Sequence, residues 1–435
     1  MKKINVIDSM PSAGKTRYMI GQIKTLPASQ KVIYITPLPS ETVRIKEGCT
    51  GKRFCKPDYK LGKGSKQTHL KDLVSKGKNI ATTHALFMLL DDEALMRIKE
   101  QNYILVMDEV VNVVKIIDAY EDYTNIDEKE KQKKCKKDIQ ESLECNYISK
   151  DDDGKLTWVD SKRFLDRYSK LKELIETREI YLSAGSVLFE LFPHKVFTED
   201  IFKEIFIMTY QFEYQLLSYY FEFFEIPYEK FGIKKHKKNG RSKENYSLVS
   251  HDDYLEYELE LRKKLKAKIH IIESEIKNKI GKKDIGSKKQ KLSVRHYKEF
   301  TEEEFKELHS KTNSFISDKL NNCTNKLMWT VYKDHVDDVK TKRMSENNFV
   351  PLNSRATNDY RHKSGVVYLV NRFVHPYIVH LFWAKSIRFK CEEYALTEML
   401  QFIFRSAIRD NLPIDIYIPS ERMRLLLIAW LNGEY

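Results

Sequence analysis

The stretch from Ser9 to Thr16 constrains the fold of this chain more than any other feature of its sequence. The apolar run Ile4 to Ile7 precedes it, and a helix-compatible run from Arg17 to Lys24 follows it. A loop between a buried strand and a helix is a place where backbone N–H groups and a helix N-terminus bind phosphate groups. This order predicts an α/β protein whose first strand ends in a phosphate-binding loop.

The tripeptide Gly14-Lys15-Thr16 supplies the residue types that phosphate binding needs. We expect Lys15 to contact the phosphates of ATP and the Thr16 hydroxyl to bind Mg²⁺. The predicted nucleotide-binding residues of the loop are Pro11, Ser12, Ala13, Gly14, Lys15 and Thr16. Ser9 stands where the usual motif has its first glycine, so an ordinary strand-to-helix turn is the alternative.

A second strong signal is the apolar run from Tyr103 to Met107, which leads directly into Asp108 and Glu109. Ligands of open parallel sheets bind at the carboxyl ends of the strands, so both carboxylates are expected at that edge. Asp108 is the predicted Mg²⁺ ligand, through water, and Glu109 is the predicted catalytic base beside the attacking water. The alternative is a common helix start, because acidic residues favour a helix N-terminus.

The charge of the chain predicts its partner. Its 435 residues include 76 Lys and Arg against 63 Asp and Glu, which gives a formal net charge of +13. A basic surface of this size indicates a polyanionic partner, and we expect single-stranded or forked nucleic acid, DNA rather than RNA. The alternative is that the lysines only solvate the surface.

Other compositional features exclude several classes of protein. The six cysteines form no Cys-x-x-Cys pair, which argues against a disulfide framework and a zinc ribbon. No apolar run approaches the roughly 18 residues of a membrane span, and the chain starts with a polar tripeptide and a short strand, without a cleavable signal. We therefore expect a cytoplasmic, monomeric protein with no membrane partner.

Further apolar runs at 31–36 and 78–84 alternate with helix-compatible segments, which predicts a parallel sheet. We expect a first domain at 1–198 with a charge-rich helical insertion at about 118–178, and a second domain at 199–435 with a basic stretch at about 234–300. Polar residues at the ends of the two strands are predicted nucleic-acid contacts: Thr36, Pro37, Thr83 and His84. A plain helix cap is the alternative for Thr83.

Five motifs of the first half together resemble the motor core of superfamily 2 helicases: Ser9–Thr16, Thr36-Pro37, Thr83-His84, Asp108-Glu109 and Ser183-Ala184. The DEAD/DEAH-like helicases of bacteriophages are the specific resemblance, and Asp108-Glu109-Val110 is also similar to the herpesvirus origin-binding helicases. The resemblance implies two RecA-like domains with ATP between them, and the host cytoplasm as the location of a phage-encoded protein. It also implies that Ser183 and Ala184 couple the nucleotide site to nucleic acid.

The second half adds two motifs to this resemblance. The stretch from Phe349 to Arg361 resembles a phage motif that lies between the two domains, and Glu398 to Asp410 resembles the motif whose arginines reach the γ-phosphate. The implied residues are Gln401 as a nucleotide contact, Arg405 or Arg409 as the arginine finger, and Thr209, Thr357, Asn358 and Arg361 as nucleic-acid contacts. The spacing of four residues predicts Gln401, Arg405 and Arg409 on one helical face.

The function that the resemblance implies first is an ATP-dependent helicase, acting in phage DNA replication, recombination or repair. A nucleic-acid-stimulated translocase or remodeller without strand separation is the second reading. A binding module switched by ATP is the third. No segment of the sequence is recognisable as the wedge that strand separation needs, so the first two readings stay open.

Overall fold

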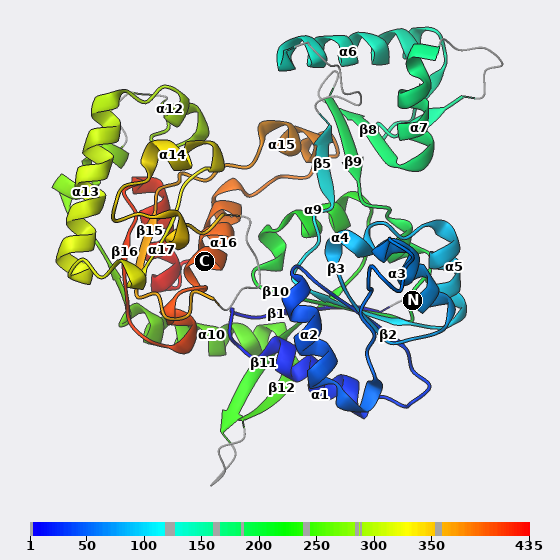
Figure 1. The fold of residues 1–435 in the computed structure, drawn as a ribbon, viewed down its shortest axis with the longest axis horizontal. Coiled ribbons are helices and arrows are strands. Elements are labelled where there is room, and N and C mark those ends of the chain that lie inside the picture. Colours follow the sequence, from blue (N-terminus) through cyan, green and yellow to red (C-terminus); the bar gives the residue numbers. More distant parts are fainter. Residues whose placement is uncertain are drawn as a thin grey trace.

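The computed structural model describes residues 3–117, 127–159, 166–183, 187–237, 244–282, 287, 289–352 and 359–435. These residues form two largely parallel sheets, each covered by helices, and a separate lobe built on a three-stranded sheet (Figure 1). The predicted fold class, α/β with parallel sheets and helical insertions, is confirmed. Within the described part of the chain, no helix is long and apolar enough to cross a membrane.

The larger sheet has the strand order β12-β11-β1-β10-β4-β2-β3. All neighbours are parallel except β11 and β12, which form an antiparallel hairpin at one edge. Its strands are β1 (Lys3–Asp8), β2 (Val32–Thr36), β3 (Ile80–Thr83), β4 (Ile104–Asp108), β10 (Glu204–Thr209), β11 (Glu229–Lys237) and β12 (Glu244–Ser250). Its helices are α1 (Lys15–Thr25), α2 (Pro39–Gly48), α3 (Lys66–Ser75), α4 (His84–Phe87), α5 (Asp92–Glu100), α8 (Lys195–Thr198), α9 (Leu216–Phe223) and α10 (His251–Lys266).

Consecutive apolar residues in a strand reflect burial of both faces of the sheet. In β2, Ile33 and Ile35 pack in one core cluster, whereas Val32 and Tyr34 pack in the cluster on the other face. Side chains of a strand alternate between the two faces, so a strand covered on both sides reads as an uninterrupted apolar run. The apolar runs of β1 and β4 have the same cause.

The second sheet is four-stranded and entirely parallel, in the order β13-β16-β15-β14. Its strands are β13 (Ile269–Ile271), β14 (Leu327–Thr330), β15 (Gly365–Tyr368) and β16 (Ile414–Tyr417). Its helices are α11 (Glu275–Asn278), α12 (Val294–Lys298), α13 (Glu302–Leu320), α14 (Val336–Val339), α16 (Cys391–Ile403) and α17 (Glu421–Asn432). Alternation again divides the core, because Met328 and Val366 face one cluster while Trp329 and Val367 face the other.

The lobe lies between β4 and β10 in the chain and corresponds to the predicted insertion. It consists of β5 (Val114–Ile117), α6 (Glu128–Glu144), β6 (Ile148–Lys150), β7 (Leu156–Trp158), α7 (Ser169–Thr177), β8 (Glu179–Ser183) and β9 (Val187–Leu191). Trp158, Leu171 and Ile175 belong to a core cluster of its own. The insertion is longer than predicted, because β8 pairs antiparallel with β9 and is not a strand of the large sheet. Ser183 therefore lies in the lobe, and Ala184 is outside the described residues.

The division between the two sheets differs from the predicted boundary at residues 198 and 199. Strand β10 pairs with β1 and β4 in the middle of the large sheet, and β11 pairs with β1 on its other side. The second sheet begins only at β13. The basic stretch predicted at about 234–300 therefore includes the edge hairpin of β11 and β12, helix α10 and strand β13. The hairpin is polar because it forms the exposed edge of the large sheet, where lysines are common.

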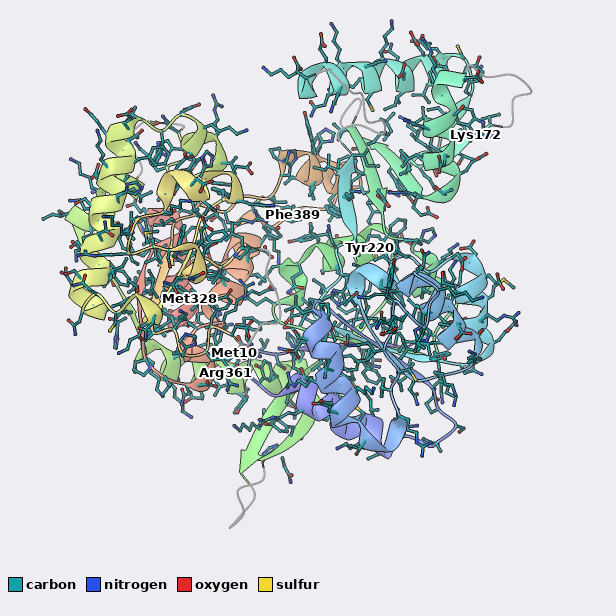
Figure 2. All side chains as sticks on the ribbon, in the orientation of Figure 1. Met10, Lys172, Tyr220, Met328, Arg361 and Phe389 are labelled. Carbon is teal, nitrogen blue, oxygen red and sulfur yellow. The ribbon has the colours of Figure 1, made fainter. Side chains whose placement is uncertain are left out.

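The two sheets are joined by packed side chains. Met10, which follows β1, belongs to the core cluster of the second sheet, and its backbone N–H donates to the Tyr254 hydroxyl over 2.7 Å. From the other side, the helix α15 (Pro376–Trp383) leaves the second sheet and packs Leu381 and Phe382 into the core of the large sheet. Figure 2 shows Met10 at the junction of the two parts.

Candidate nucleotide-binding site

The loop between β1 and α1 has the backbone conformation of a phosphate cradle. Ser12 and Gly14 both adopt positive φ angles, 68° and 97°, which turn consecutive N–H groups toward one side. Ser9 keeps a φ angle outside that region, so it tolerates a side chain where the usual motif has glycine. Its hydroxyl accepts a hydrogen bond from the Ile233 N–H over 2.8 Å, which ties the loop to β11.

The first turn of α1 has no side-chain cap. Gly14 is the N-cap, and no side chain caps the first N–H groups of this helix, which therefore lack intrahelical partners. Uncapped N–H groups and the helix dipole together favour a negatively charged group at this end. The residues predicted to cradle phosphates, Pro11 to Thr16, thus surround a site with the right electrostatics.

Lys15 is buried at the base of the loop, with 8% of its surface exposed. Its ammonium donates to the carbonyl oxygens of Ser9 and Met10, the second over 3.1 Å. Burial lowers the pKa of Lys15, and the nearby carboxylates of Glu109 and Asp8 oppose that lowering. The ammonium is therefore held by two backbone carbonyls, within electrostatic reach of the three carboxylates of Glu109, Asp8 and Asp108.

Thr16 and Asp108, the two residues predicted to bind Mg²⁺, meet across the sheet edge. The Thr16 Oγ1 donates to Asp108 Oδ2 over 3.2 Å, and the Tyr34 hydroxyl donates to the same oxygen over 3.1 Å. Burial raises the pKa of Asp108 to about 6, and the neighbouring Glu109 adds to this increase. A bound cation would remove that penalty, because it pairs the carboxylate with positive charge.

Glu109 follows Asp108 in a strained conformation. Its φ angle is 66°, unusual for a residue with a side chain, and its backbone N–H donates to the Met208 carbonyl over 2.9 Å. Its Oε2 is buried without a hydrogen-bond partner. A buried carboxylate oxygen without a partner is costly, and strain of this kind persists where surrounding structure enforces it. The surrounding structure thus places the Glu109 Oε2, a hydrogen-bond acceptor without a partner, beside the loop.

The two candidate arginines of the second half do not lie on one helix face. Helix α16 ends at Ile403, and Arg409 lies in a 3₁₀ helix, Ala407–Asp410, so the predicted common face is wrong. Ser406 is extended between them, which breaks the helical spacing. Gln401 lies in the last turns of α16, with its Nε2 buried and lacking a hydrogen-bond partner.

Arg409 lies in a different environment from Arg405, within electrostatic reach of Glu109. Burial lowers its pKa, the positive charges of Arg361 and Arg44 lower it further, and Glu41 and Glu109 oppose the effect. Arg409 in turn lowers the pKa of Lys15. Arg405, by contrast, is only 4% exposed; its guanidinium donates to the Pro351 carbonyl over 3.4 Å and lies over the Phe402 ring. The structure therefore distinguishes the two candidates.

The predicted nucleic-acid contacts lie in three environments. Thr36 and Thr209 are buried at strand ends, where their hydroxyls donate to the Leu38 carbonyl and to the Gln215 side chain. Pro37 and His84 also follow strand ends, at the edge that carries Asp108. The Thr83 hydroxyl accepts from the Leu86 N–H as the cap of α4, as the alternative reading had it.

The remaining predicted contacts come from the second half of the chain. Thr357 and Asn358 lie outside the described residues. Arg361 forms a two-pronged ion pair with Asp410, next to Arg409. Arg361 therefore helps to position the segment that carries Arg409.

Two functional residues escaped the sequence analysis. Tyr34 is fully buried and orients Asp108, and Asp8 accepts hydrogen bonds from the N–H groups of Gln211 and Phe212 at 2.7 and 2.9 Å. Burial raises the pKa of Asp8 to about 6. The sequence contains a signal for Asp8, because a carboxylate ends the first strand directly before the loop. It contains none for Tyr34, which has the pattern of a core residue of its strand.

The fold and the site define an α/β protein with a Rossmann-like C-terminal domain. Residues 263–431 match the family model described as the YonV C-terminal Rossmann-like domain. The chain is 31% identical over 446 residues to the SPbeta prophage-derived uncharacterized protein YonV of Bacillus subtilis (strain 168), and the match covers 100% of both chains. The protein therefore belongs to the YonV family.

Two solved structures resemble the chain distantly. Xpd4 of S. tokodaii has a TM-score of 0.39 and 12% identity, covering 99% of this chain and 94% of Xpd4. The DUF1998 helicase MrfA, solved with DNA and AMPPNP, has a TM-score of 0.30 and 10% identity, covering 100% of this chain and 48% of MrfA. Similarity at this level carries no functional assignment.

Proposed function

We propose that this protein is an ATP-hydrolysing motor of the superfamily 2 type that acts on nucleic acid. The observation that carries the proposal is the contact between Thr16 Oγ1 and Asp108 Oδ2 at 3.2 Å, at the end of an uncapped helix. P-loop ATPases hold Mg²⁺ between a loop hydroxyl and a strand-end carboxylate of this kind. Both residues lie at the carboxyl ends of the parallel strands, where ligands of open α/β sheets bind.

The residues of the loop divide the work of binding. The N–H groups of Pro11 to Thr16, proline excepted, would hold the phosphates, and Lys15 would exchange its carbonyl acceptors for phosphate oxygens. Thr16 and Asp108 would hold Mg²⁺, which when bound would neutralise charge on the phosphates. Glu109 would accept the proton of the attacking water, because its Oε2 is buried and has no competing donor.

Arg409 would complete the site from the second sheet. Its guanidinium already lies within electrostatic range of Glu109 and Lys15, although the two parts of the chain belong to different sheets. An arginine delivered across such a junction stabilises charge on the transferring phosphoryl group. Gln401, with its unpartnered amide, would contact the nucleotide from the same side.

Nucleic acid is the proposed track. The net charge of +13 favours a polyanion. Of the predicted contacts of the first half, Pro37, Thr83 and His84 are partly exposed at the carboxyl ends of the strands, whereas Thr36 and Thr209 are buried there. Hydrolysis would then depend on the track, because binding across both sheets would set the position of Arg409. Thr357 and Asn358 complete the proposed contact set.

An ATPase assay with and without single-stranded DNA tests the proposal. We expect slow hydrolysis by the protein alone and a marked increase on addition of the strand. A strand-displacement assay on a forked duplex then separates a helicase from a translocase that does not unwind. Absence of both nucleotide binding and hydrolysis in the folded protein would contradict the proposal.

A further inference from the structure

Helix α15 and the segment directly before it carry a row of exposed aromatic rings. Phe373, His375, Tyr377, His380 and Trp383 are all exposed, and we call them the aromatic face. Trp383 is 69% exposed and Tyr377 41%. Within the helix the rings recur at a spacing of three residues, so they share one side. Large aromatic side chains rarely stay exposed together unless they meet a partner.

The helix that presents this face is firmly held. Its opposite side buries Leu381 and Phe382 in the core of the large sheet, where the Tyr219 ring stacks on Phe389 with centroids 4.1 Å apart. The Tyr219 hydroxyl also accepts from the Lys390 N–H over 3.1 Å. The face is thus a rigid surface, which loses little conformational entropy when it binds a planar group.

Basic residues follow the aromatic face along the chain. Lys385, Arg388 and Lys390 are exposed, while Ile387 and Phe389 between them are buried. This alternation is that of an extended segment, anchored on one side and charged on the other. Lys385 pairs with Asp153 of the lobe, and the nearby Glu392 is paired with Arg422, so the surplus charge of the segment is positive.

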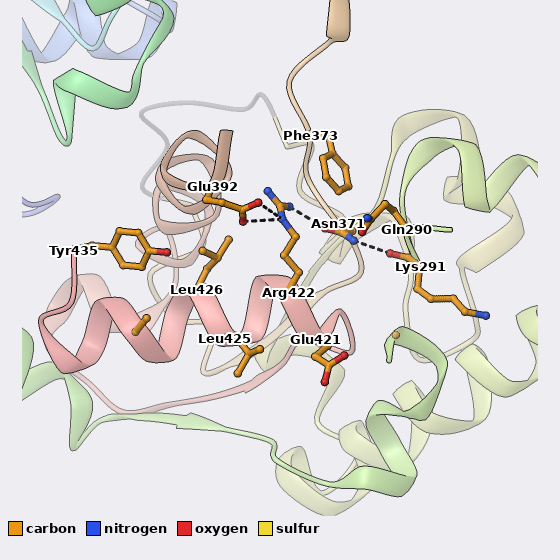
Figure 3. A pocket seen from close by; sticks show the side chains of 12 residues that line it. Gln290, Lys291, Asn371, Phe373, Glu392, Glu421, Arg422, Leu425, Leu426 and Tyr435 are labelled. Carbon is orange, nitrogen blue, oxygen red and sulfur yellow. Dashed lines mark hydrogen bonds and ion pairs between the residues drawn. The ribbon is translucent and has the colours of Figure 1, made fainter. Parts of the chain in front are cut away.

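At its other end the face runs into a pocket of about 530 Å³ (Figure 3). Phe373 lines the pocket and lies over the Arg422 guanidinium, 4.4 Å from its carbon to the ring centroid. Arg422 is held by Glu392 over 2.8 Å and by Asn371 over 3.0 Å. The row of rings therefore leads from the carboxyl ends of the second sheet toward the lobe, and Figure 1 shows α15 between them.

We propose that the aromatic face of α15 stacks the bases of single-stranded nucleic acid, whose phosphates contact Arg388 and Lys390. This assignment rests on the proposed motor function and specifies where the protein binds the nucleic-acid strand. Base stacking on aromatic rings flanked by basic residues is the common mode of binding single strands without sequence preference. Aromatic residues also occur at protein interfaces, so the choice of partner rests on the exposed basic residues beside the rings and on the net charge of +13, which favour a polyanion.

Tryptophan fluorescence tests the assignment directly. Of the four tryptophans, Trp158, Trp329 and Trp430 are at most 9% exposed, so Trp383 is the one that a bound base can reach. Adding oligodeoxythymidylate to the full chain without ATP should quench the emission. Trp383→Phe should abolish most of the quenching and keep the affinity within about twofold, because phenylalanine still stacks.

Affinity measurements with a labelled strand complete the test. Trp383→Ala should weaken binding by about fivefold to 100-fold, the loss expected for one stacked base. Arg388→Gln should reduce the salt dependence by about one phosphate contact, a change of about 0.7 in the log–log slope. Tyr59→Ala, which removes a 61% exposed aromatic residue from a loop of the large sheet, is the matched control and should bind like the parent.

The outcomes separate this inference from the proposed function. If the parent hydrolyses ATP and binds the strand, but Trp383→Ala binds equally well, the inference is wrong and the motor stands. If Trp383→Ala alters only the oligomeric state in sedimentation, the face docks a second copy and the inference is equally wrong. If the parent protein neither hydrolyses ATP nor binds the strand, both the inference and the proposed function are wrong.

Discussion

Thr16 and Asp108 lie 92 residues apart in the chain, yet Thr16 Oγ1 donates to Asp108 Oδ2 over 3.2 Å. The contact exists because β10 lies between β1 and β4, which brings their carboxyl ends to one edge of the sheet. Tyr34 on β2 holds the same carboxylate from the other side. One sheet edge thus gathers a hydroxyl, two carboxylates and a buried ammonium.

Replacing Lys15 should abolish turnover. In Lys15→Ala the phosphates lose a buried cation, so we expect ATP hydrolysis to fall by at least about 10²-fold, as for other preorganised donors. Steady-state ATPase assays with a thermal melt measure activity and folding together. Lys24→Ala, an exposed lysine on the same helix, should hydrolyse like the parent. Parent-like hydrolysis by folded Lys15→Ala would remove the phosphate-loop assignment.

Replacing Glu109 should separate binding from hydrolysis. Glu109→Gln keeps the size of the side chain but cannot accept the proton of water, so turnover should fall by about 10² to 10⁴. Nucleotide affinity, measured by calorimetry, should change little. The matched control is Glu47→Gln, an exposed carboxylate on α2. Unchanged turnover in Glu109→Gln would exclude Glu109 as the base.

Replacing the two arginines should affect different properties, hydrolysis in one case and stability in the other. Arg409→Ala should lose strand-stimulated hydrolysis by about 10³ or more while it still binds ATP. Arg405→Ala should instead lower the melting temperature, because Arg405 is buried over Phe402 and donates to the Pro351 carbonyl. The exposed Arg97 provides the control in Arg97→Ala. Stimulated turnover within twofold of the parent in Arg409→Ala would end the finger assignment.

The raised pKa of Asp108 predicts a dependence on pH. Its pKa is about 6 in the folded protein against 3.8 ordinarily, so the folded state binds the proton more tightly. The contribution of Asp108 to stability is therefore greatest below about pH 4 and falls, by about 2 kcal/mol, as the pH rises to 6. Urea unfolding of the parent and of Asp108→Asn between pH 4 and 7.5 isolates this term from that of Asp8.

Binding of Mg²⁺ with ATP should show the opposite trend. The cation needs the ionised carboxylate, so affinity for the magnesium nucleotide should increase as the pH rises through about 6. Calorimetric titration at several pH values measures it, with magnesium-free ATP as the control. An affinity that does not change between pH 5 and 7 would mean that Asp108 is not a ligand.

Affinity for single-stranded DNA should fall steeply with salt. Each phosphate neutralised by Lys or Arg contributes about −0.7 to the log–log slope on a single strand. Titrations of a labelled strand between low and physiological salt measure the slope, and an uncharged peptide-backbone analogue of the strand serves as control. A slope near zero would point to a partner other than nucleic acid.

The sequence by itself determined the local features of this protein. A phosphate loop is made by consecutive backbone groups, so Gly14, Lys15 and Thr16 reveal it without any distant contact. Strands buried on both faces, such as those ending at Thr36 and Asp108, are uninterrupted apolar runs for the same reason. These features fixed the α/β class and the residues at the sheet edge.

Only the tertiary structure decided how the strands are ordered and in which surroundings Arg405 and Arg409 lie. A short apolar run looks alike in a parallel and an antiparallel sheet, so nothing in residues 179–183 showed that they pair with β9 in the lobe. Spacing alone could not show that Ser406 breaks the helix between Arg405 and Arg409. Such choices depend on packing between segments far apart in the chain, which a local pattern does not encode.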